Sequence, residues 1–245
     1  MEVSEAKERI IVGLDVDNAA RAVALVGQLK DHVGVFKVGL ELLNSAGSGI
    51  IATLRQAGAE RFFYDAKLHD IPNTVTGAMN AISGLGVWCV TVHAGGGEAM
   101  LRAAVETAQT QADKNNLPRP KILAVTVLTS ISQAVLRNEL QVCAPLAEHV
   151  AHLARMAQTA GCDGVIASPH ESKIVRDAVL DPDFLIVTPG VRPAGSAKGD
   201  QARVMTPGEA IRCGADYLVI VRPIVAAPDP VAAAQAIAAE IASAE

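Results

Sequence analysis

The stretch RFFYDAKLHDIPNTVTGAMNAISGLGVWCVTVH (residues 61–93) contains the repeating unit from which the fold can be predicted. An apolar run at 61–67 precedes an amphipathic segment at 74–85, and a second apolar run follows at 87–93. Short, nearly continuous apolar runs are typical of strands that are buried on both faces, and such strands alternate with helices in parallel sheets. This stretch therefore predicts a strand, a helix and a second strand parallel to the first.

The same unit recurs along the 245 residues. Further strands are predicted at 10–15, 35–39, 122–128, 163–168, 184–189 and 216–221, and helices at segments such as 19–29, 50–57, 98–112, 145–160 and 170–180. Eight strands alternating with helices predict an α/β fold, a single-domain (β/α)8 TIM barrel over residues 1–245. A doubly wound open sheet is the alternative, although no GxGxxG follows the first strand.

Composition argues against several kinds of partner. The formal net charge is −5, so we expect neither a nucleic acid nor an anionic membrane as partner. No run approaches the roughly 18 uninterrupted apolar residues of a membrane span, and the charged first residues do not resemble a signal peptide. The four cysteines lie far apart without CxxC spacing. We therefore expect reduced thiols in a cytoplasmic protein rather than disulfides or a zinc site.

Two charges stand where a buried strand is expected. Asp65 and Lys67 flank Ala66, and regular alternation would place both charges on one face. Burying them costs several kcal/mol per ion unless they are paired, so they form either a structural ion pair or part of a site. Strand ends of a barrel converge on one mouth, which favours a site. Other polar residues at predicted strand ends are Asp15, Lys37, His93, Thr129, Ser130, Arg192 and Arg222.

Some features have an ordinary explanation beside a functional one. His93 precedes three glycines and could begin an anion-binding helix N-terminus, or simply a strand-to-helix turn. Asp17 and Asn18 are expected to cap a helix, and His69 is given no role. The segment 192–205, rich in Gly, Ala and polar residues, is either a mobile lid or a solvated loop.

The run D-A-K-L-H-D-I-P-N-T at 65–74 resembles the D-x-K-x-x-D-I-P-N-T signature of the orotidine 5′-phosphate decarboxylase family. The resemblance continues, in the family's order, through FKVG at 36–39, VHA at 92–94, AVTVLTS at 124–130, TPGVRP at 188–193 and GDQARVMTP at 199–207. It implies a homodimeric (β/α)8 barrel that converts orotidine 5′-monophosphate to uridine 5′-monophosphate and CO2 in de novo pyrimidine synthesis. The resemblance also implies that the reaction needs neither a metal nor an organic cofactor.

The resemblance further implies roles for individual residues. A tetrad of alternating charge would consist of Lys37, Asp65, Lys67 and Asp70. Lys67 would stabilise and then protonate the carbanion that loss of CO2 leaves at C6. The partner subunit's site would receive Asp70, Ile71 and Thr74. Contacts to the substrate are implied for Asp15 and Lys37 at the ribose, Thr129 and Ser130 at the nucleotide, and Arg192, Gln201 and Arg222 around the 5′-phosphate.

One position departs from the family's pattern. The family usually has V-I-G-R-P at the end of strand eight, whereas this chain has V-I-V-R-P at 219–223. A glycine N–H can approach a phosphate without a Cβ in the way, and valine is stiff and resists positive φ. Val221 therefore either crowds the phosphate subsite, or has ordinary β backbone and points away from the ligand.

Two other functions remain open. The 3-keto-gulonate phosphate decarboxylases share the DxKxxD motif but use a metal. They resemble this chain less, because they have an acidic residue where Lys37 stands and lack the IPNT continuation. A non-catalytic nucleotide-binding barrel is the other alternative, and Val221 is the feature that supports it.

Overall fold

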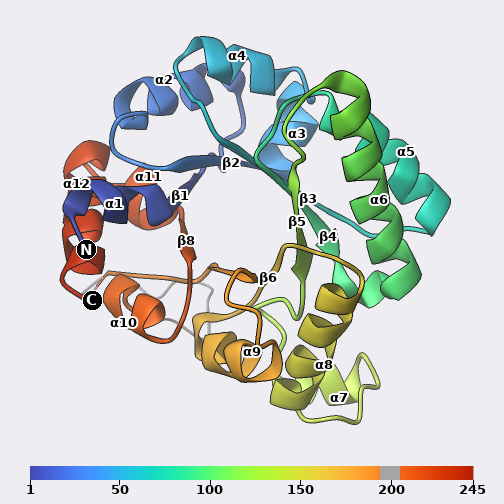
Figure 1. Ribbon diagram of the computed structural model, residues 1–245. Coiled ribbons are helices and arrows are strands. Elements are labelled where there is room, and N and C mark those ends of the chain that lie inside the picture. The colour runs from blue at the N-terminus through green and yellow to red at the C-terminus, as the bar shows by residue number, and fades with distance from the viewer. Residues whose placement is uncertain (194–204, 245) are drawn as a thin grey trace.

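A computed structural model describes residues 1–193 and 205–244. Within these residues, eight parallel strands form one closed barrel in sequence order, and β8 pairs back onto β1. Helices surround the ring of strands (Figure 1). The predicted (β/α)8 TIM barrel is confirmed, and the doubly wound open sheet is wrong because the sheet has no open edge.

All of the predicted strands are present, most of them shorter than predicted. Their bounds are β1 (Ile10–Gly13), β2 (Val35–Gly39), β3 (Phe62–Leu68), β4 (Cys89–His93), β5 (Lys121–Val125), β6 (Gly164–Ile166), β7 (Leu185–Thr188) and β8 (Tyr217–Ile220). The residues that follow each strand have left the ladder and form the loops at the C-terminal mouth of the barrel.

The predicted helices are also present. The helix predicted at 19–29 has the same bounds as α2. In the described part of the chain the helices are α1 (Val3–Ala6), α2 (Ala19–Leu29), α3 (Leu40–Ala46), α4 (Ile50–Gln56), α5 (Pro72–Ser83), α6 (Glu98–Asn115), α7 (Gln133–Asn138), α8 (Leu146–Thr159), α9 (Ser172–Ala178), α10 (Pro207–Arg212), α11 (Arg222–Val225) and α12 (Pro230–Ala242). Short 3-10 helices lie at Lys7–Arg9, Ala94–Gly96 and Pro169–Glu171. As expected, Asn18 caps α2, accepting the Arg21 N–H. None of the described helices is long and apolar enough to cross a membrane.

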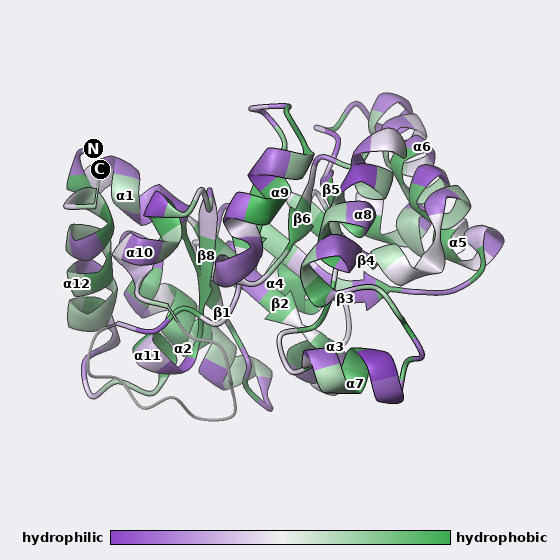
Figure 2. Cartoon of the chain, turned by 90° about the horizontal axis from the view of Figure 1, so that it is seen from below, coloured by the Kyte–Doolittle hydropathy of each residue, from purple (hydrophilic) through white to green (hydrophobic). Residues whose placement is uncertain are grey.

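Apolar side chains form two cores, separated by the sheet. The outer core lies between the strands and the helices, whose hydrophobic residues face inward while hydrophilic residues face outward (Figure 2). The inner core fills the barrel and consists of Ile11, Val35, Phe63, Cys89, Leu123, Val125, Ile166, Val187 and Val219. Because side chains alternate along a strand, residues two positions further on also point inward, nearer the mouth. On the first four strands those residues are Gly13, Lys37, Asp65 and Thr91.

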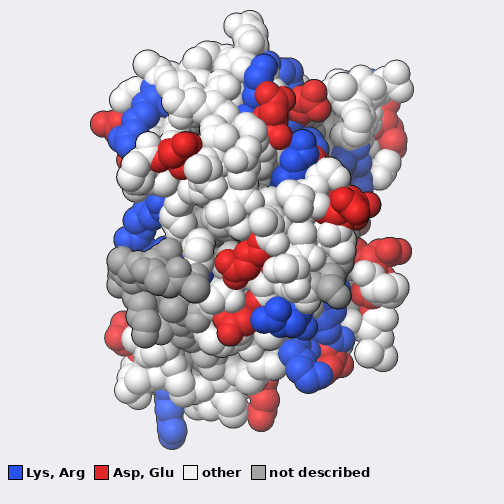
Figure 3. All heavy atoms as spheres, turned by 90° about the vertical axis from the view of Figure 1, so that its left-hand side faces the viewer, with Lys and Arg blue, Asp and Glu red and all other residues white. Residues whose placement is uncertain are grey.

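The opposite, N-terminal end of the barrel is held by ion pairs and aromatic contacts. The Arg61 guanidinium lies 4.6 Å from the ring centroid of Trp88. Asp216, directly before β8, accepts the Ile186 N–H of β7 at 2.6 Å and pairs with Arg176. Asp163, directly before β6, makes the equivalent contacts with β5. Elsewhere on the surface, the face around α1 and α12 carries acidic and basic side chains interspersed (Figure 3).

Candidate active site

A cavity of about 470 Å³ opens at the C-terminal ends of the strands. A second cavity of about 220 Å³ adjoins it and shares Lys67, Ile166 and Pro189 with it. The structure brings most of the predicted site residues to these two cavities: Asp15, Lys37, Asp65, Lys67, Arg192, Val221 and Arg222 line the larger, and Thr129 and Ser130 the smaller. Gln201, and the interior of the predicted lid at 192–205, lie outside the described residues.

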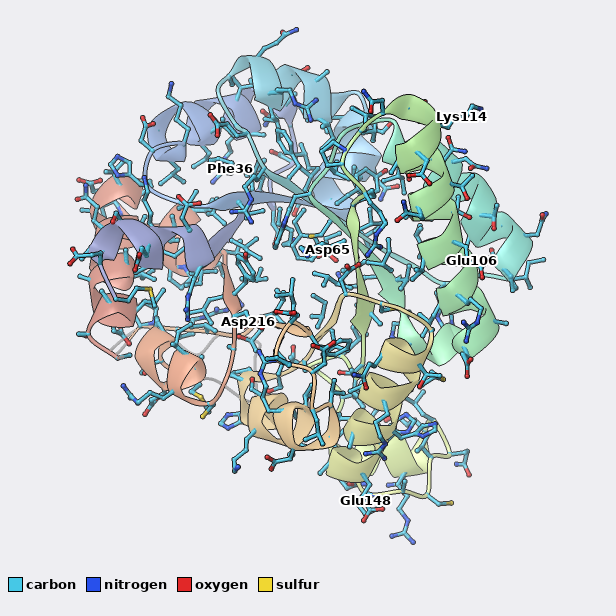
Figure 4. The ribbon with its side chains drawn as sticks, in the orientation of Figure 1. Phe36, Asp65, Glu106, Lys114, Glu148 and Asp216 are labelled. Carbon is cyan, nitrogen blue, oxygen red and sulfur yellow. The ribbon has the colours of Figure 1, made fainter. Side chains whose placement is uncertain are left out.

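Four of these side chains form an ion network of alternating sign. Lys37 Nζ lies 2.9 Å from Asp15 Oδ1 and 3.4 Å from Asp65 Oδ2. Lys67 Nζ lies 2.8 Å from the other oxygen of Asp65, Oδ1. Lys37 and Asp65 are each only 7% exposed, and Figure 4 shows Asp65 inside the ring of strands. Each buried charge therefore has an opposite charge beside it, which offsets the cost of burial.

The network keeps its buried members ionised. Burial by itself would raise the pKa of Asp65, but the charges of Lys37 and Lys67 and hydrogen bonds from Lys67 and Thr91 lower it below its ordinary value. Burial would lower the pKa of Lys37, but the charges of Asp65 and Asp15, with hydrogen bonds to both, raise it above its ordinary value. Near neutral pH, Asp65 is therefore a carboxylate and Lys37 an ammonium.

Two glycines give the Lys37 side chain its room. A Cβ on Gly13 would lie 3.0 Å from Lys37 Cε, and a Cβ on Gly39 would lie 2.8 Å from Lys37 Nζ. Gly13 ends β1 and Gly39 ends β2, so the lysine chain passes between two strand ends that carry no side chain. A larger residue at either position would displace the ammonium from its two carboxylates.

Strand β3 is irregular where it carries the charges. Its pairing with β4 shifts register between Tyr64 and Leu68, and Lys67 has a φ of +49°. Asp65 and Lys67 line the same cavity, as expected for one face, but the strand is not regular between them. Positive φ is uncommon for a residue with a side chain and occurs mainly where surrounding contacts maintain it.

The residues expected to serve a partner subunit lie on the loop after β3 and at the start of α5. Asp70, Ile71 and Thr74 are all exposed, and Ile71 has 66% of its surface accessible. Asp70 accepts the Ile71 N–H at 2.7 Å. Neither cavity is lined by any of the three in the single chain described here.

His93 forms the ordinary turn that was one of its two explanations. Its Nδ1 accepts the Gly95 N–H at 3.1 Å as the chain enters the 3-10 helix. The ring of His69 stacks on it, with centroids 4.9 Å apart. Burial, together with the neighbouring His69 and Lys67, lowers the pKa of His93. The pair therefore joins the loop that follows β3 to the loop that follows β4.

Val221 lies at the cavity wall, between β8 and α11. Its φ is −115° and its ψ is −90°, so the backbone has neither the positive φ that valine resists nor the ordinary β conformation of the alternative. Its side chain lines the larger cavity and packs against the inner core, so the expectation that it points away is wrong. A Cβ on Gly13 would lie 2.6 Å from Val221 Cγ2, so Val221 fills space that this glycine leaves open.

Thr91 is a residue of the site that the sequence did not single out. It is fully buried and hydrogen-bonds both Asp65 and Lys67. The alternation of Cys89, Thr91 and His93 on β4 would have indicated that it points into the barrel. Threonine is also a common strand residue, however, so the pattern gave no reason to assign it a role.

A closed barrel with buried, alternating charges at its C-terminal mouth defines a (β/α)8-barrel enzyme that binds a small, polar substrate. The chain belongs to the orotidine 5′-phosphate decarboxylase / HUMPS family, whose model matches residues 8–237. Among the described residues, no group of three or more His, Cys, Asp and Glu side chains could hold a metal ion.

Named relatives cover almost the whole chain. The orotidine 5′-phosphate decarboxylase of Moorella thermoacetica is 54% identical over 96% of this chain and 93% of its own length. The protein of the same name from Heliobacterium modesticaldum is 48% identical over 97% of each chain. The crystal structure of orotidine 5′-phosphate decarboxylase from Lactobacillus acidophilus superimposes with a TM-score of 0.83, at 43% identity, over 95% of this chain and 98% of that one.

Proposed function

We propose that this protein decarboxylates orotidine 5′-monophosphate to uridine 5′-monophosphate and CO2, in the de novo synthesis of pyrimidine nucleotides. The supporting observation is the network Asp15–Lys37–Asp65–Lys67 at the mouth of a barrel that belongs to this family. Relatives about half identical to the chain bear the name of this activity.

Lys67 is the group that acts on the reacting carbon. When the bond from C6 to the carboxylate breaks, its electron pair remains on C6 in the plane of the ring, where no π system delocalises it directly. A cation already in place stabilises this charge as it develops, which lowers the barrier more than it strengthens substrate binding. Breaking the bond releases CO2, and the Lys67 ammonium then gives its proton to C6. Asp65, whose Oδ1 lies 2.8 Å from Lys67 Nζ, forms an ion pair with the lysine before the reaction.

The two cavities divide the substrate between them. The smaller is lined by Val125, Val127 and Leu128 with Thr129 and Ser130, an apolar slot with hydroxyls that suits a pyrimidine. The larger contains Arg192 and Arg222, whose guanidinium groups suit a 5′-phosphate. Asp15 and Lys37 lie in the larger cavity and can hold the ribose hydroxyls. Gln201, which lies outside the described residues, would complete the phosphate subsite.

The active form is a homodimer with sites shared between subunits. Exposed Asp70, Ile71 and Thr74 would complete the partner's charged cluster, which makes Asp70 the fourth member of the tetrad. The enzyme works in the cytoplasm, where its four free cysteines stay reduced, and needs neither metal nor organic cofactor. The exposure of the loop supports the dimer, the free cysteines support the cytoplasmic location, and the chemistry assigned to Lys67 supports a reaction without metal or organic cofactor.

Steady-state decarboxylation of orotidine 5′-monophosphate, with and without EDTA, tests the proposal. We expect saturable turnover that the chelator does not change. We expect Lys67→Ala to lower kcat by about 10³-fold or more, with the far-UV circular dichroism of a folded barrel. Lys173→Ala, which removes an exposed lysine of α9, is the matched control and should retain normal turnover.

Three results would count against the proposal. Activity lost on chelation would favour a metal-dependent sugar-phosphate decarboxylase. Nucleotide binding without turnover would favour a non-catalytic barrel. Near-normal turnover by Lys67→Ala would remove the role given to that lysine.

A further inference from the structure

A single hydroxyl connects the two central charged residues of the site. Thr91 lies on β4, is 0% exposed and points into the barrel. Its Oγ1 accepts the backbone N–H of Lys67 at 2.9 Å. It also donates to Asp65 Oδ1, again at 2.9 Å. A hydroxyl has one hydrogen, and a backbone N–H can only donate, so the directions of both bonds are determined.

The position of Thr91 opposite the irregular part of β3 explains why it is needed. Tyr64 pairs with Val90, and the next pair in register is Leu68 with Val92. Strand β3 therefore advances four residues while β4 advances two. The extra residues interrupt the regular register, and within this interruption the backbone N–H of Lys67 donates to the Thr91 hydroxyl. The Thr91 side chain thus supplies a hydrogen-bond acceptor where the two strands are out of register.

We propose that Thr91 is a positioning residue of the decarboxylase site, which directs the Lys67 ammonium and orients the Asp65 carboxylate. The inference rests on the proposed function. Through the N–H, Thr91 maintains the unusual backbone at Lys67, from which the side chain turns toward the cavity. Through the O–H, it sets the rotation of Asp65 so that Oδ1 meets Lys67 and Oδ2 faces Lys37.

The proposal distinguishes positioning from ordinary packing. A threonine that only filled space could be replaced by valine, which has nearly the same shape, without affecting chemistry. If Thr91 positions Lys67, losing the hydroxyl misplaces the ammonium relative to C6, and such misplacement lowers the rate of the chemical step far more than it weakens substrate binding.

The test compares Thr91→Val and Thr91→Ser with the wild-type chain in steady-state decarboxylation. For Thr91→Val we expect kcat to fall by about 10–100-fold with KM changed less than about threefold. Thr91→Ser keeps the hydroxyl and should recover kcat to within a few-fold of wild type. Thr126→Val is the matched control, since Thr126 is another buried threonine, and its hydroxyl donates to the backbone carbonyl of Ile166 rather than to a carboxylate. It should lower Tm as Thr91→Val does and leave kcat nearly unchanged.

The kcat values of these variants decide whether Thr91 positions Lys67. Unchanged kcat in Thr91→Val overturns the inference, as does a serine variant no better than valine. If Thr91→Val does not fold, Thr91→Cys, with its weaker donor, should give a kcat between those of the serine variant and Lys67→Ala. A kcat equal to wild type would then overturn the inference. Absence of turnover by the wild-type chain in the same assay overturns the proposed function and the inference together, whereas wild-type turnover with unaffected Thr91→Val overturns the inference alone.

Discussion

The Val221 side chain lies at the rim of the cavity, in space that is free because Gly13 has no side chain. A Cβ added to Gly13 would lie only 2.6 Å from Val221 Cγ2, which is too close for both to be present. The adjacent Arg222 also lines the cavity, so any phosphate held there lies beside a branched side chain. The backbone at Val221 needs no glycine, since its φ is negative, and the effect of valine is therefore steric.

Replacing Val221 with glycine should strengthen substrate binding. We expect Val221→Gly to lower KM about 10-fold, equivalent to about 1.4 kcal/mol, because the backbone N–H becomes accessible to the phosphate. Some stability should be lost, since Val221 packs against the inner core. Steady-state kinetics over a wide substrate range, with Tm measured in parallel, would check this. An unchanged KM would mean that valine does not crowd the phosphate.

The titration of Asp65 should be visible in the stability of the protein. Its pKa is lowered in the folded state, because attraction to Lys37 and Lys67 outweighs burial. A lowered folded pKa contributes stability above the unfolded value of about 3.9, and that stability is lost as pH falls through the folded pKa. The excess free energy of unfolding of wild type over Asp65→Asn should be constant from about pH 5 to 9 and shrink below about pH 4. Urea denaturation across this range measures it, and an excess that persists undiminished to pH 3 would contradict the assignment.

Strands β6 and β8 are preceded by the same arrangement of hydrogen bond and ion pair. An aspartate directly before each strand accepts a backbone N–H of the preceding strand and pairs with an arginine, Asp163 with Arg119 and Asp216 with Arg176. Strand starts at the N-terminal end of the barrel are thereby joined in the correct register, far from the mouth where the site lies.

The hydrogen bond and ion pair before each of these strands should contribute to the free energy of unfolding without affecting kcat. Asp216→Ala removes the acceptor of the Ile186 N–H and the carboxylate that pairs with Arg176, although the guanidinium still donates to the Gly214 and Phe184 carbonyls. We expect the free energy of unfolding to fall by about 1–3 kcal/mol. Asp177→Ala removes an exposed ion pair with Lys173 and should change it by less than about 0.5 kcal/mol. Urea denaturation and kcat, measured on both variants, test this. A loss of kcat in Asp216→Ala at full folding would show that the two ends of the barrel are coupled.

The strands and helices could be predicted because each is indicated by a pattern within its own stretch of sequence. The details of the site could not be predicted, because they depend on contacts between strands. Apolar runs and amphipathic segments indicated the strands and α2, and polar strand ends indicated Lys37, Asp65 and Lys67. The register shift at β3 depends on pairing between two strands, which no pattern within one strand reports. The roles of Thr91 and Gly13 depend on contacts across the barrel, and each residue alone is ordinary in a strand.

For the whole molecule, the division of one site between two subunits can be tested by mixing inactive variants. In a dimer of Lys67→Ala with Asp70→Asn, one site would have both substitutions and the other neither. Random pairing makes half of the dimers mixed, each with one intact site, so the mixture should recover about one quarter of wild-type activity. Refolding equal amounts of the two variants together, with each variant refolded alone as control, would check it. No recovery in a mixture shown to contain mixed dimers would place Asp70 in its own subunit's site.

Closure of the barrel has a consequence for biosynthesis. Ile10 of β1 pairs with Leu218 of β8, so the first strand to leave the ribosome receives its second neighbour only when the eighth has been made. Through most of translation, β1 presents an unpaired edge, the kind of surface along which nascent chains associate wrongly. Contacts so distant in sequence also slow the search for the native state. A chain that still lacks β8 is therefore an open sheet, and the arginine beside β8 cannot join the lysines and aspartates of the first three strands until that strand has been made.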